Sequence, residues 1–403
     1  MRHKILFILL STILVGTFSI AHAKSGNPYQ DVLTLISENQ LPTKEFKLYV
    51  DALNQDIEQS NSWGIATDLT NLGKLYVFRD KYDIALSLFE RSLAISRRNQ
   101  DQQGVFWNVE GIGWVYWRKG EYSKSLDNLM PILGLAKKAN DNKAEARILS
   151  VIGNIYLERA DYDMAIKVSE RLEEIGRIIK NKGMQAEALT IIGSVYFYKG
   201  EYNNAQKNWQ NALIIYRELG DLQNEGLLFH NIGANYYSMN PPDNEKALFN
   251  MRKAIKIRSE SGDLAGEAAT LLNVGNVYSA MGKETEALAT FKKAIGINRK
   301  IGSKYGESHA LTNIGDLYLT QGKFDEALIN LQQAKVIQAE TQDKYFLAIT
   351  LYKIAFIFSK QGKIDEAIKL LEEAVKLGRL IQDPDLPKYS DLLKELKQRR
   401  VGN

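Results

Sequence analysis

Residues 311–331 read LTNIGDLYLTQGKFDEALINL, and this stretch decides the fold because its pattern recurs along the chain. An apolar residue, a glycine and, three residues further on, a tyrosine stand here as Ile314, Gly315 and Tyr318. The same pattern occurs at Leu72-Gly73 with Tyr76, Ile112-Gly113 with Tyr116, Ile152-Gly153 with Tyr156, Ile192-Gly193 with Tyr196, Ile232-Gly233 with Tyr236, Val274-Gly275 with Tyr278, and Ile354-Ala355 with Phe358. Successive copies are 40 residues apart, except for one step of 42. A register kept over eight copies predicts a repeat architecture.

Each repeat is predicted to contain two helices. Leu69, Leu72, Gly73 and Tyr76 have the spacing of one stripe on a helix, and Ala85 and Phe89 begin the facing stripe of a second helix. Glycine opposite alanine is expected to let the two backbones approach closely. A further series of glycines marks the turn between the helices: Gly120, Gly200, Gly282, Gly322 and Gly362.

Short polar residues are expected to begin each following repeat. They are Asp101, Asp141, Asn181, Asp221, Asp263, Asp343 and Asp383. Their side chains can accept the free N–H groups of the next helix. Two irregularities stand out: Pro131 predicts a kink or an early break in its helix, and residues 239–243 insert two residues at a turn.

The Leu-x-x-Ile-Gly-x-x-Tyr…Gly…Ala-x-x-x-Phe-x-x-Ala pattern resembles the tetratricopeptide repeat, whose usual period is about 34 residues. The 40-residue period is similar to the long-helix variant in kinesin light chain and spindle-orientation adaptors. The resemblance implies an all-α, right-handed superhelical solenoid of antiparallel helix pairs. Since one pair cannot bury its apolar stripe alone, neighbouring pairs must stack.

Four segments are expected along the chain. Residues 1–23 have a basic start, an apolar run and Ala21-His22-Ala23, which predicts a signal peptide cleaved before Lys24 and export to the periplasm or the exterior. Residues 24–62 are expected to form degenerate capping helices, residues 63–383 eight repeats, and residues 384–403 a capping helix. No membrane span is expected after cleavage. The alternative is an uncleaved anchor.

Composition argues against several classes of function. Without Arg2 and Lys4, 50 basic residues face 48 acidic ones, and the charges do not pool as nucleic-acid binding requires. The chain has no cysteine, which excludes disulfides and thiolate metal sites. No catalytic motif, metal-ligand spacing or cofactor site is present, so the sequence predicts neither an enzyme nor a cofactor. A homo-oligomer is compatible with the sequence but not indicated by it.

The resemblance also implies a ligand-binding groove, lined by the face of each first helix opposite the Leu-Gly-Tyr stripe. By register this face carries Trp107, Glu110, Trp114, Trp117, Arg118, Asn154, Glu158, Phe197, Tyr198, His230, Asn231, Tyr237, Asn273, Asn276, Asn313 and Asp316. Tryptophan and tyrosine supply anchor area, and asparagine amides can pair with an extended backbone. These residues predict a scaffold that binds a protein or peptide segment.

Two other interpretations stay open. The aromatic residues could pack against the next repeat and bind nothing. Alternatively, they could stack on sugar rings of a carbohydrate or envelope component, or the solenoid ends and convex face could serve assembly. A peptide ligand should depend on the asparagine positions, whereas a glycan should depend on Trp114 and Trp117 with little effect of Asn273.

Overall fold

The computed structural model describes residues 29–77, 79 and 81–402, so the predicted signal peptide lies outside the described residues. The described chain is all-α and contains 19 helices. It divides into two compact units, Met1–Val195 and Tyr196–Asn403. None of the described helices is long and apolar enough to span a bilayer.

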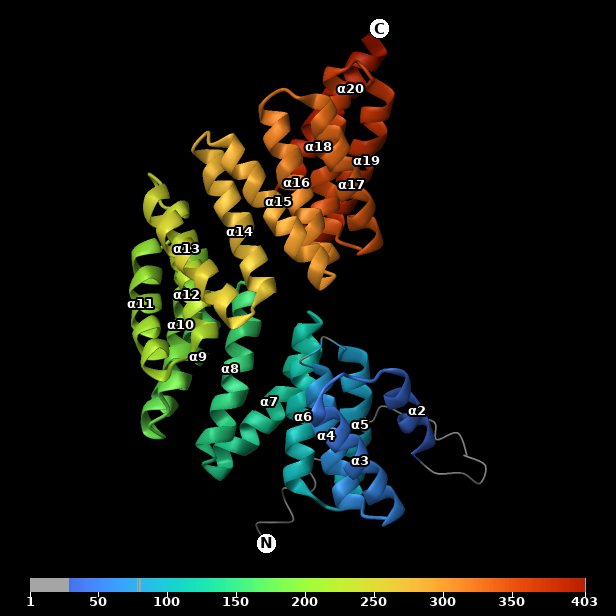
Figure 1. Cartoon of the computed structure of the whole chain (residues 1–403), viewed down its shortest axis with the longest axis vertical. Coiled ribbons are helices and arrows are strands. Elements are labelled where there is room, and N and C mark those ends of the chain that lie inside the picture. The colour runs from blue at the N-terminus through green and yellow to red at the C-terminus, as the bar shows by residue number, and fades with distance from the viewer. Residues whose placement is uncertain (1–28, 78, 80, 403) are drawn as a thin grey trace. The chain divides into compact units, whose positions relative to one another are not determined.

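Unit 1 consists of paired helices preceded by two shorter ones (Figure 1). Its helices are α2 (Gln30–Glu38), α3 (Lys44–Glu58), α4 (Ser62–Val77), α5 (Tyr82–Arg98), α6 (Gln102–Arg118), α7 (Tyr122–Ala139), α8 (Asn142–Glu158), α9 (Tyr162–Ile178) and most of α10 (Lys182–Tyr198). Helices α4 and α5, α6 and α7, and α8 and α9 pack as antiparallel pairs. The first helices α4, α6 and α8 also contact one another in series.

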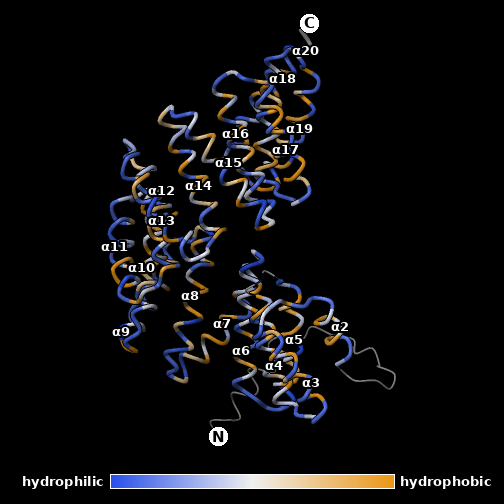
Figure 2. Tube along the Cα trace, viewed as in Figure 1, coloured by the Kyte–Doolittle hydropathy of each residue, from blue (hydrophilic) through white to orange (hydrophobic). Residues whose placement is uncertain are grey.

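Unit 2 continues the same arrangement. Its helices are α11 (Tyr202–Leu219), α12 (Leu222–Ser238), α13 (Asn244–Ser261), α14 (Leu264–Ala280), α15 (Glu284–Ile301), α16 (Lys304–Thr320), α17 (Phe324–Glu340), α18 (Lys344–Lys360), α19 (Ile364–Ile381) and α20 (Leu386–Gly402). Figure 2 shows hydrophobic and hydrophilic residues alternating along the helices, as expected where one face of each is buried. The predicted all-α helix-pair solenoid is therefore confirmed within each unit.

The glycine series permits close packing, and a large side chain of the second helix lies directly opposite Gly275 and Gly315. A Cβ added at Gly275 would lie 2.4 Å from Cε1 of Phe291, and one at Gly315 would lie 2.6 Å from Cγ of Leu331. The glycine therefore faces the large side chain of the second helix, and the alanine four residues before that side chain also lies close, with the carbonyl oxygen of Ala327 3.4 Å from a Cβ added at Gly315. The alanine is still required, because Ala287 and Ala327 are fully buried beside these contacts.

The predicted caps form. Asp141 accepts a hydrogen bond from the backbone N–H of Ala144 at 3.0 Å, and Asp263 accepts one from Gly266 at 2.8 Å. Ser303 fills the same role for α16, where the aspartate series is interrupted. These bonds fix where each first helix begins, and hence which of its faces packs.

The two irregular segments behave differently from each other. The sequence predicts a kink or an early break at Pro131; the early break does not occur, because α7 runs on to Ala139. A proline removes one backbone donor, and the helix is held by buried neighbours such as Leu129 and Ile132. The insertion at 239–243 loops out, since Asp243 still donates its N–H to the carbonyl of Tyr236 at 2.9 Å.

Candidate functional site

The predicted site residues all lie on first helices of the pairs, or on the end of α10. Unit 1 carries Trp107, Glu110, Trp114, Trp117 and Arg118 on α6, and Asn154 and Glu158 on α8. Unit 2 carries Phe197 and Tyr198 at the end of α10, His230, Asn231 and Tyr237 on α12, Asn273 and Asn276 on α14, and Asn313 and Asp316 on α16.

In unit 1, two tryptophans and an arginine form one cluster, here called the tryptophan site. The rings of Trp114 and Trp117 meet edge to face, with centroids 5.7 Å apart. The guanidinium of Arg118 lies over both rings, at 5.4 and 5.9 Å from their centroids. Both tryptophans are half-buried against the core, so their backs are held and their free edges remain accessible. A rigid, amphipathic aromatic surface of this kind suits an anchor residue of a ligand.

Polar contacts fix the tryptophan site to the neighbouring helices. Trp117 donates its indole N–H to Glu158 on α8 at 3.1 Å. Arg118 donates through Nε to the hydroxyl of Tyr82 at 3.2 Å. Burial, and a hydrogen bond with Glu158, raise the pKa of Tyr122, so that phenol stays protonated. These contacts limit ring motion before any ligand arrives.

The other residues of this face also connect successive first helices. Lys74 on α4 lies 5.6 Å from the ring centroid of Trp107, which is 42% exposed. Glu110 accepts two bonds from Arg147 on α8, at 2.9 and 3.2 Å, and this pairing raises the pKa of Arg147. Asn154 donates to the carbonyl of Ser150 on its own helix. Glu110 is therefore engaged with α8 and Asn154 with its own helix, whereas Trp107 keeps an exposed ring.

At the end of α10, the two aromatic residues differ. Phe197 packs against Tyr202 and Trp209, with centroid distances of 5.9 and 5.8 Å, and is part of the support for α11. Tyr198 is 63% exposed and touches Phe197 edge to face. Tyr198 is therefore the more exposed of the two, and Phe197 is half-buried.

His230 belongs to a buried polar network in unit 2. Its Nδ1 lies 3.1 Å from the hydroxyl of Thr270, which donates to the carbonyl of Gly266 and accepts a bond from Arg258. Since that hydroxyl proton is used, the network places the imidazole proton on Nδ1. Nε2 then accepts from Asn273 at 3.2 Å. Burial, and the nearby charge of Arg258, lower the pKa of His230 to about 4, so it is neutral near pH 7.

Three asparagines of the predicted site have side chains without a hydrogen bond in the described residues. Asn231, Asn276 and Asn313 are half-buried, and no side-chain hydrogen bond ties them to other residues in the described part of the chain. Tyr237 is also half-buried, but its ring packs against the core cluster that contains Val274. Free amides on three successive first helices are here called the amide row; they can pair with the N–H and C=O groups of an extended peptide.

Two cations that pair with predicted site residues were not among the residues predicted from the sequence. Arg147 pairs with Glu110, and Lys353 pairs with Asp316 at 2.8 Å. The register signal was present, because Arg147 stands 40 residues after Trp107 and therefore on the same face. Within the described residues, no group of three His, Cys, Asp or Glu side chains could hold a metal ion.

Comparison with known proteins supports the repeat interpretation. Tetratricopeptide repeat models match residues 66–99, 266–335 and 350–377. A signal-transduction ATPase with a tetratricopeptide repeat sensor, from Pyrococcus horikoshii, has TM-score 0.61 and 18% identity over 90% of this chain, which spans 54% of that protein. A search of the curated proteins finds no match to the sequence.

Two further solved structures are similar. A Rap protein complexed with competence and sporulation factor has TM-score 0.52 and 18% identity, covering 84% of this chain and 98% of that one. Aspartyl phosphate phosphatase F from Bacillus subtilis has TM-score 0.51 and 15% identity, covering 83% and 94%. At these identities the likeness shows the fold alone.

Proposed function

Because this chain is a tetratricopeptide-repeat protein, we propose that it is a non-catalytic scaffold whose first-helix face binds an extended segment of another protein. The tryptophan site carries this proposal. Both rings pack against the core, and the indole N–H of Trp117 is bonded to Glu158. The rings are nevertheless only half-buried, and the cation of Arg118 lies next to them. Pre-organised aromatic and arginine side chains are the residues most enriched at interface hot spots.

The amide row suits the same type of ligand. Asn231, Asn276 and Asn313 leave their amide groups unused, and an extended peptide presents N–H and C=O groups that need partners. A glycan would use the tryptophan site without the amide row. A Rap protein of similar fold was solved with a bound factor, which supports a binding role for this chain but does not identify its ligand.

A scaffold role fits the chemistry of the site better than catalysis does. The histidine on this face, His230, is neutral, with both ring nitrogens engaged. Glu110 and Asp316 are each paired with a cation, so neither is poised as a general base. A similar fold does occur in a phosphatase, but fold alone carries no activity to this chain.

The test is peptide selection on residues 24–403, followed by affinity measurement. Binders chosen from a random peptide library are titrated against the natural sequence, Trp114→Ala/Trp117→Ala, and Phe249→Ala, an exposed aromatic on a second helix. The double change should weaken binding by about 30-fold or more, as expected for hot-spot residues. Equal affinity for all three proteins would contradict the tryptophan site.

A second set of variants separates peptide from glycan. Replacing Asn231, Asn276 and Asn313 together by alanine should weaken peptide binding by about tenfold, because each lost hydrogen bond contributes about 0.5–1.5 kcal/mol. Binding of a carbohydrate should be unaffected by this triple change. Circular dichroism controls for loss of fold in every variant.

We also propose that the scaffold works outside the cytoplasm. The support is the basic start, the apolar run and Ala21-His22-Ala23 at residues 1–23. Intact-mass measurement of the protein recovered after expression of the whole sequence should show a chain beginning at Lys24. Ala21→Arg/Ala23→Arg should block processing, and an unprocessed natural sequence would contradict export by this route.

A further inference from the structure

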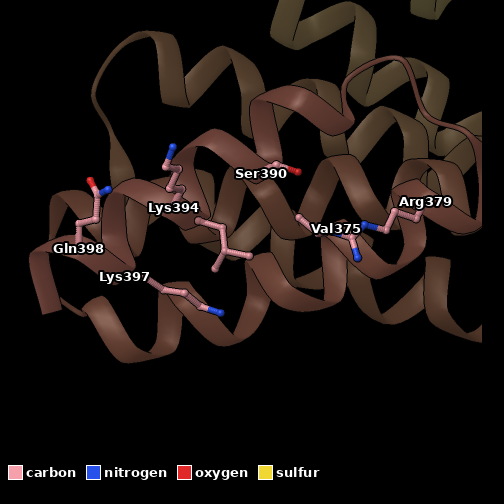
Figure 3. A pocket seen from close by; sticks show the side chains of 7 residues that line it. Val375, Arg379, Ser390, Lys394, Lys397 and Gln398 are labelled. Carbon is pink, nitrogen blue, oxygen red and sulfur yellow. The ribbon is translucent and has the colours of Figure 1, made fainter. Parts of the chain in front are cut away.

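At the end of unit 2, helices α19 and α20 enclose an open groove of about 610 Å³ (Figure 3). Its lining includes Val375, Arg379, Ser390, Leu393, Lys394 and Lys397. Figure 3 shows Lys394 and Lys397 toward one end of the groove and Arg379 with Val375 toward the other. The groove thus has an apolar floor and cations along its length, and it belongs to neither the tryptophan site nor the amide row.

The preceding first helix, α18, shows which face a second helix normally covers. Leu351, Ala355 and Phe358 form the stripe that packs against α19. A second row of buried residues on α18 contains Thr350 and Ile357. Leu351 and Phe358, the two ends of the stripe, each come one residue after a member of that row. The row with Thr350 and Ile357 packs against the preceding helix pair, α16 and α17. The stripe that packs against α19 is therefore found one residue later in the sequence than this row.

The same rule places the corresponding stripe of α20 in the groove. Tyr389 and Leu396 are the buried residues that anchor α20 to α19. Ser390 and Lys397 each come one residue after these two and correspond to Leu351 and Phe358 of α18. Lys394 lies between them and corresponds to Ala355. All three line the groove. The groove is thus the position that the next second helix occupies in an interior repeat.

The stripe is apolar on α18, with Leu351, Ala355 and Phe358, whereas on α20 it is polar and basic. A lysine at 394 stands where α18 has the small residue that lets two helix backbones approach, so a helix bound here must lie further from α20 than α19 lies from α18. Arg379 and Lys394 have no carboxylate partner in the described part of the chain. Lys397 pairs with Glu372 at 2.6 Å, leaving three cations against one carboxylate.

We propose that this groove binds an acidic amphipathic helix of a partner protein. The apolar side of such a helix would cover Val375 and Leu393, and its carboxylates would meet Arg379, Lys394 and Lys397. The shape favours a helix, because a second helix fills the equivalent position in the preceding repeat, where α17 packs between α16 and α18. The uncompensated cations select an acidic helix over a neutral one.

The experiment uses residues 24–403 and a hydrocarbon-stapled helical peptide with leucines at three- and four-residue spacing and glutamates on its flanks. Two control peptides replace the glutamates with glutamine or with lysine. The protein variants are Lys394→Glu/Lys397→Glu and Lys376→Glu, an exposed lysine of α19 that does not line the groove. Fluorescence anisotropy at low and high salt gives each affinity, and sedimentation gives the oligomeric state.

The natural sequence should bind the glutamate peptide saturably and more weakly at high salt. The double charge reversal should weaken binding by about tenfold or more, since two attractive contacts become repulsive, whereas Lys376→Glu should not. Absence of saturable binding, equal binding of the lysine peptide, or no effect of the double reversal would each overturn the proposal. So would a dimer that the double reversal dissociates, because a second copy would then fill the groove. Trp114→Ala/Trp117→Ala should leave this binding intact, which separates it from the proposed function.

Discussion

Replacing Gly275 by alanine tests whether the glycine series holds the helix pairs together. An added Cβ would lie 2.4, 2.6 and 2.8 Å from three atoms of the Phe291 ring. That ring is 1% exposed and has no room to withdraw. Overpacking of this kind typically costs about 1–3 kcal/mol, and we expect the upper end because three ring atoms are too close. Alanine regains about 1 kcal/mol of helix propensity, so the net loss should be about 2 kcal/mol.

Gly296 provides the matched control. It lies on the neighbouring helix α15, is exposed, and has no atom within 4 Å of an added Cβ. Gly296→Ala should therefore stabilise the protein by about 1 kcal/mol, so the same substitution has opposite signs on adjacent helices.

Urea denaturation followed by circular dichroism measures both changes as shifts of the midpoint. Midpoints are compared at unchanged slope, because long repeat arrays can depart from two-state unfolding. Combining Gly275→Ala with Phe291→Leu should cost less than the sum of the two single changes, since the smaller side chain removes the clash. If Gly275→Ala left the midpoint unchanged or raised it, the close-packing argument would be refuted.

Three further perturbations follow from local features. Ala160 has φ of 57°, a left-handed conformation, so Ala160→Gly should raise the unfolding free energy by about 0.5–1 kcal/mol in a urea titration, and a loss would contradict the assignment of strain. Asp263→Ala removes the cap on Gly266 N–H and should lower thermal stability by about 1–2 kcal/mol, whereas Asp263→Asn should retain most of it. Burial, then the charge of Asp56 and a hydrogen bond with it, raise the pKa of Asp68 to about 6. The folded state therefore holds this proton more tightly than the unfolded chain, and stability should fall as pH rises from about 4 to 6. Asp68→Asn should flatten that dependence and stabilise the protein at pH 7 by up to about 2 kcal/mol; an unchanged pH profile would refute the shift.

The fold was predictable because the same spacing of buried residues recurs in every repeat. The spacing of Ile314, Gly315 and Tyr318 defines one buried stripe, and Asp343 marks where the next helix begins. Two packing details could not be predicted in full, for a shared reason. The partner of a glycine and the fate of α7 at Pro131 both depend on atoms contributed by neighbouring helices. Sequence register places a residue on a face but does not say which side chain fills the space opposite.

The candidate site was predictable only to the level of that face. Register placed His230 and Asn273 on it, but their bond to each other depends on Thr270 and Arg258, which hold the imidazole in one tautomer. Similarly, the sequence alone does not distinguish an unpaired Glu110, available to a ligand, from a Glu110 that pairs with Arg147. Only three-dimensional distances separate these cases, and they divide the predicted residues into engaged and accessible ones.

The pairing of Glu110 with Arg147 also limits how such an array can change length during evolution. Glu110 reaches the residue 37 positions further on, and Ser150 reaches Glu187 across the same interval. Deleting 40 residues between Glu110 and Glu187 would leave these two glutamates 37 positions apart, which is the separation at which Glu110 now pairs with Arg147. Two carboxylates would then face each other in place of a salt bridge. The copies are therefore not interchangeable parts, because each carries the complement of its own neighbour. Loss or duplication of a single copy would leave a mismatched junction that later substitutions must repair.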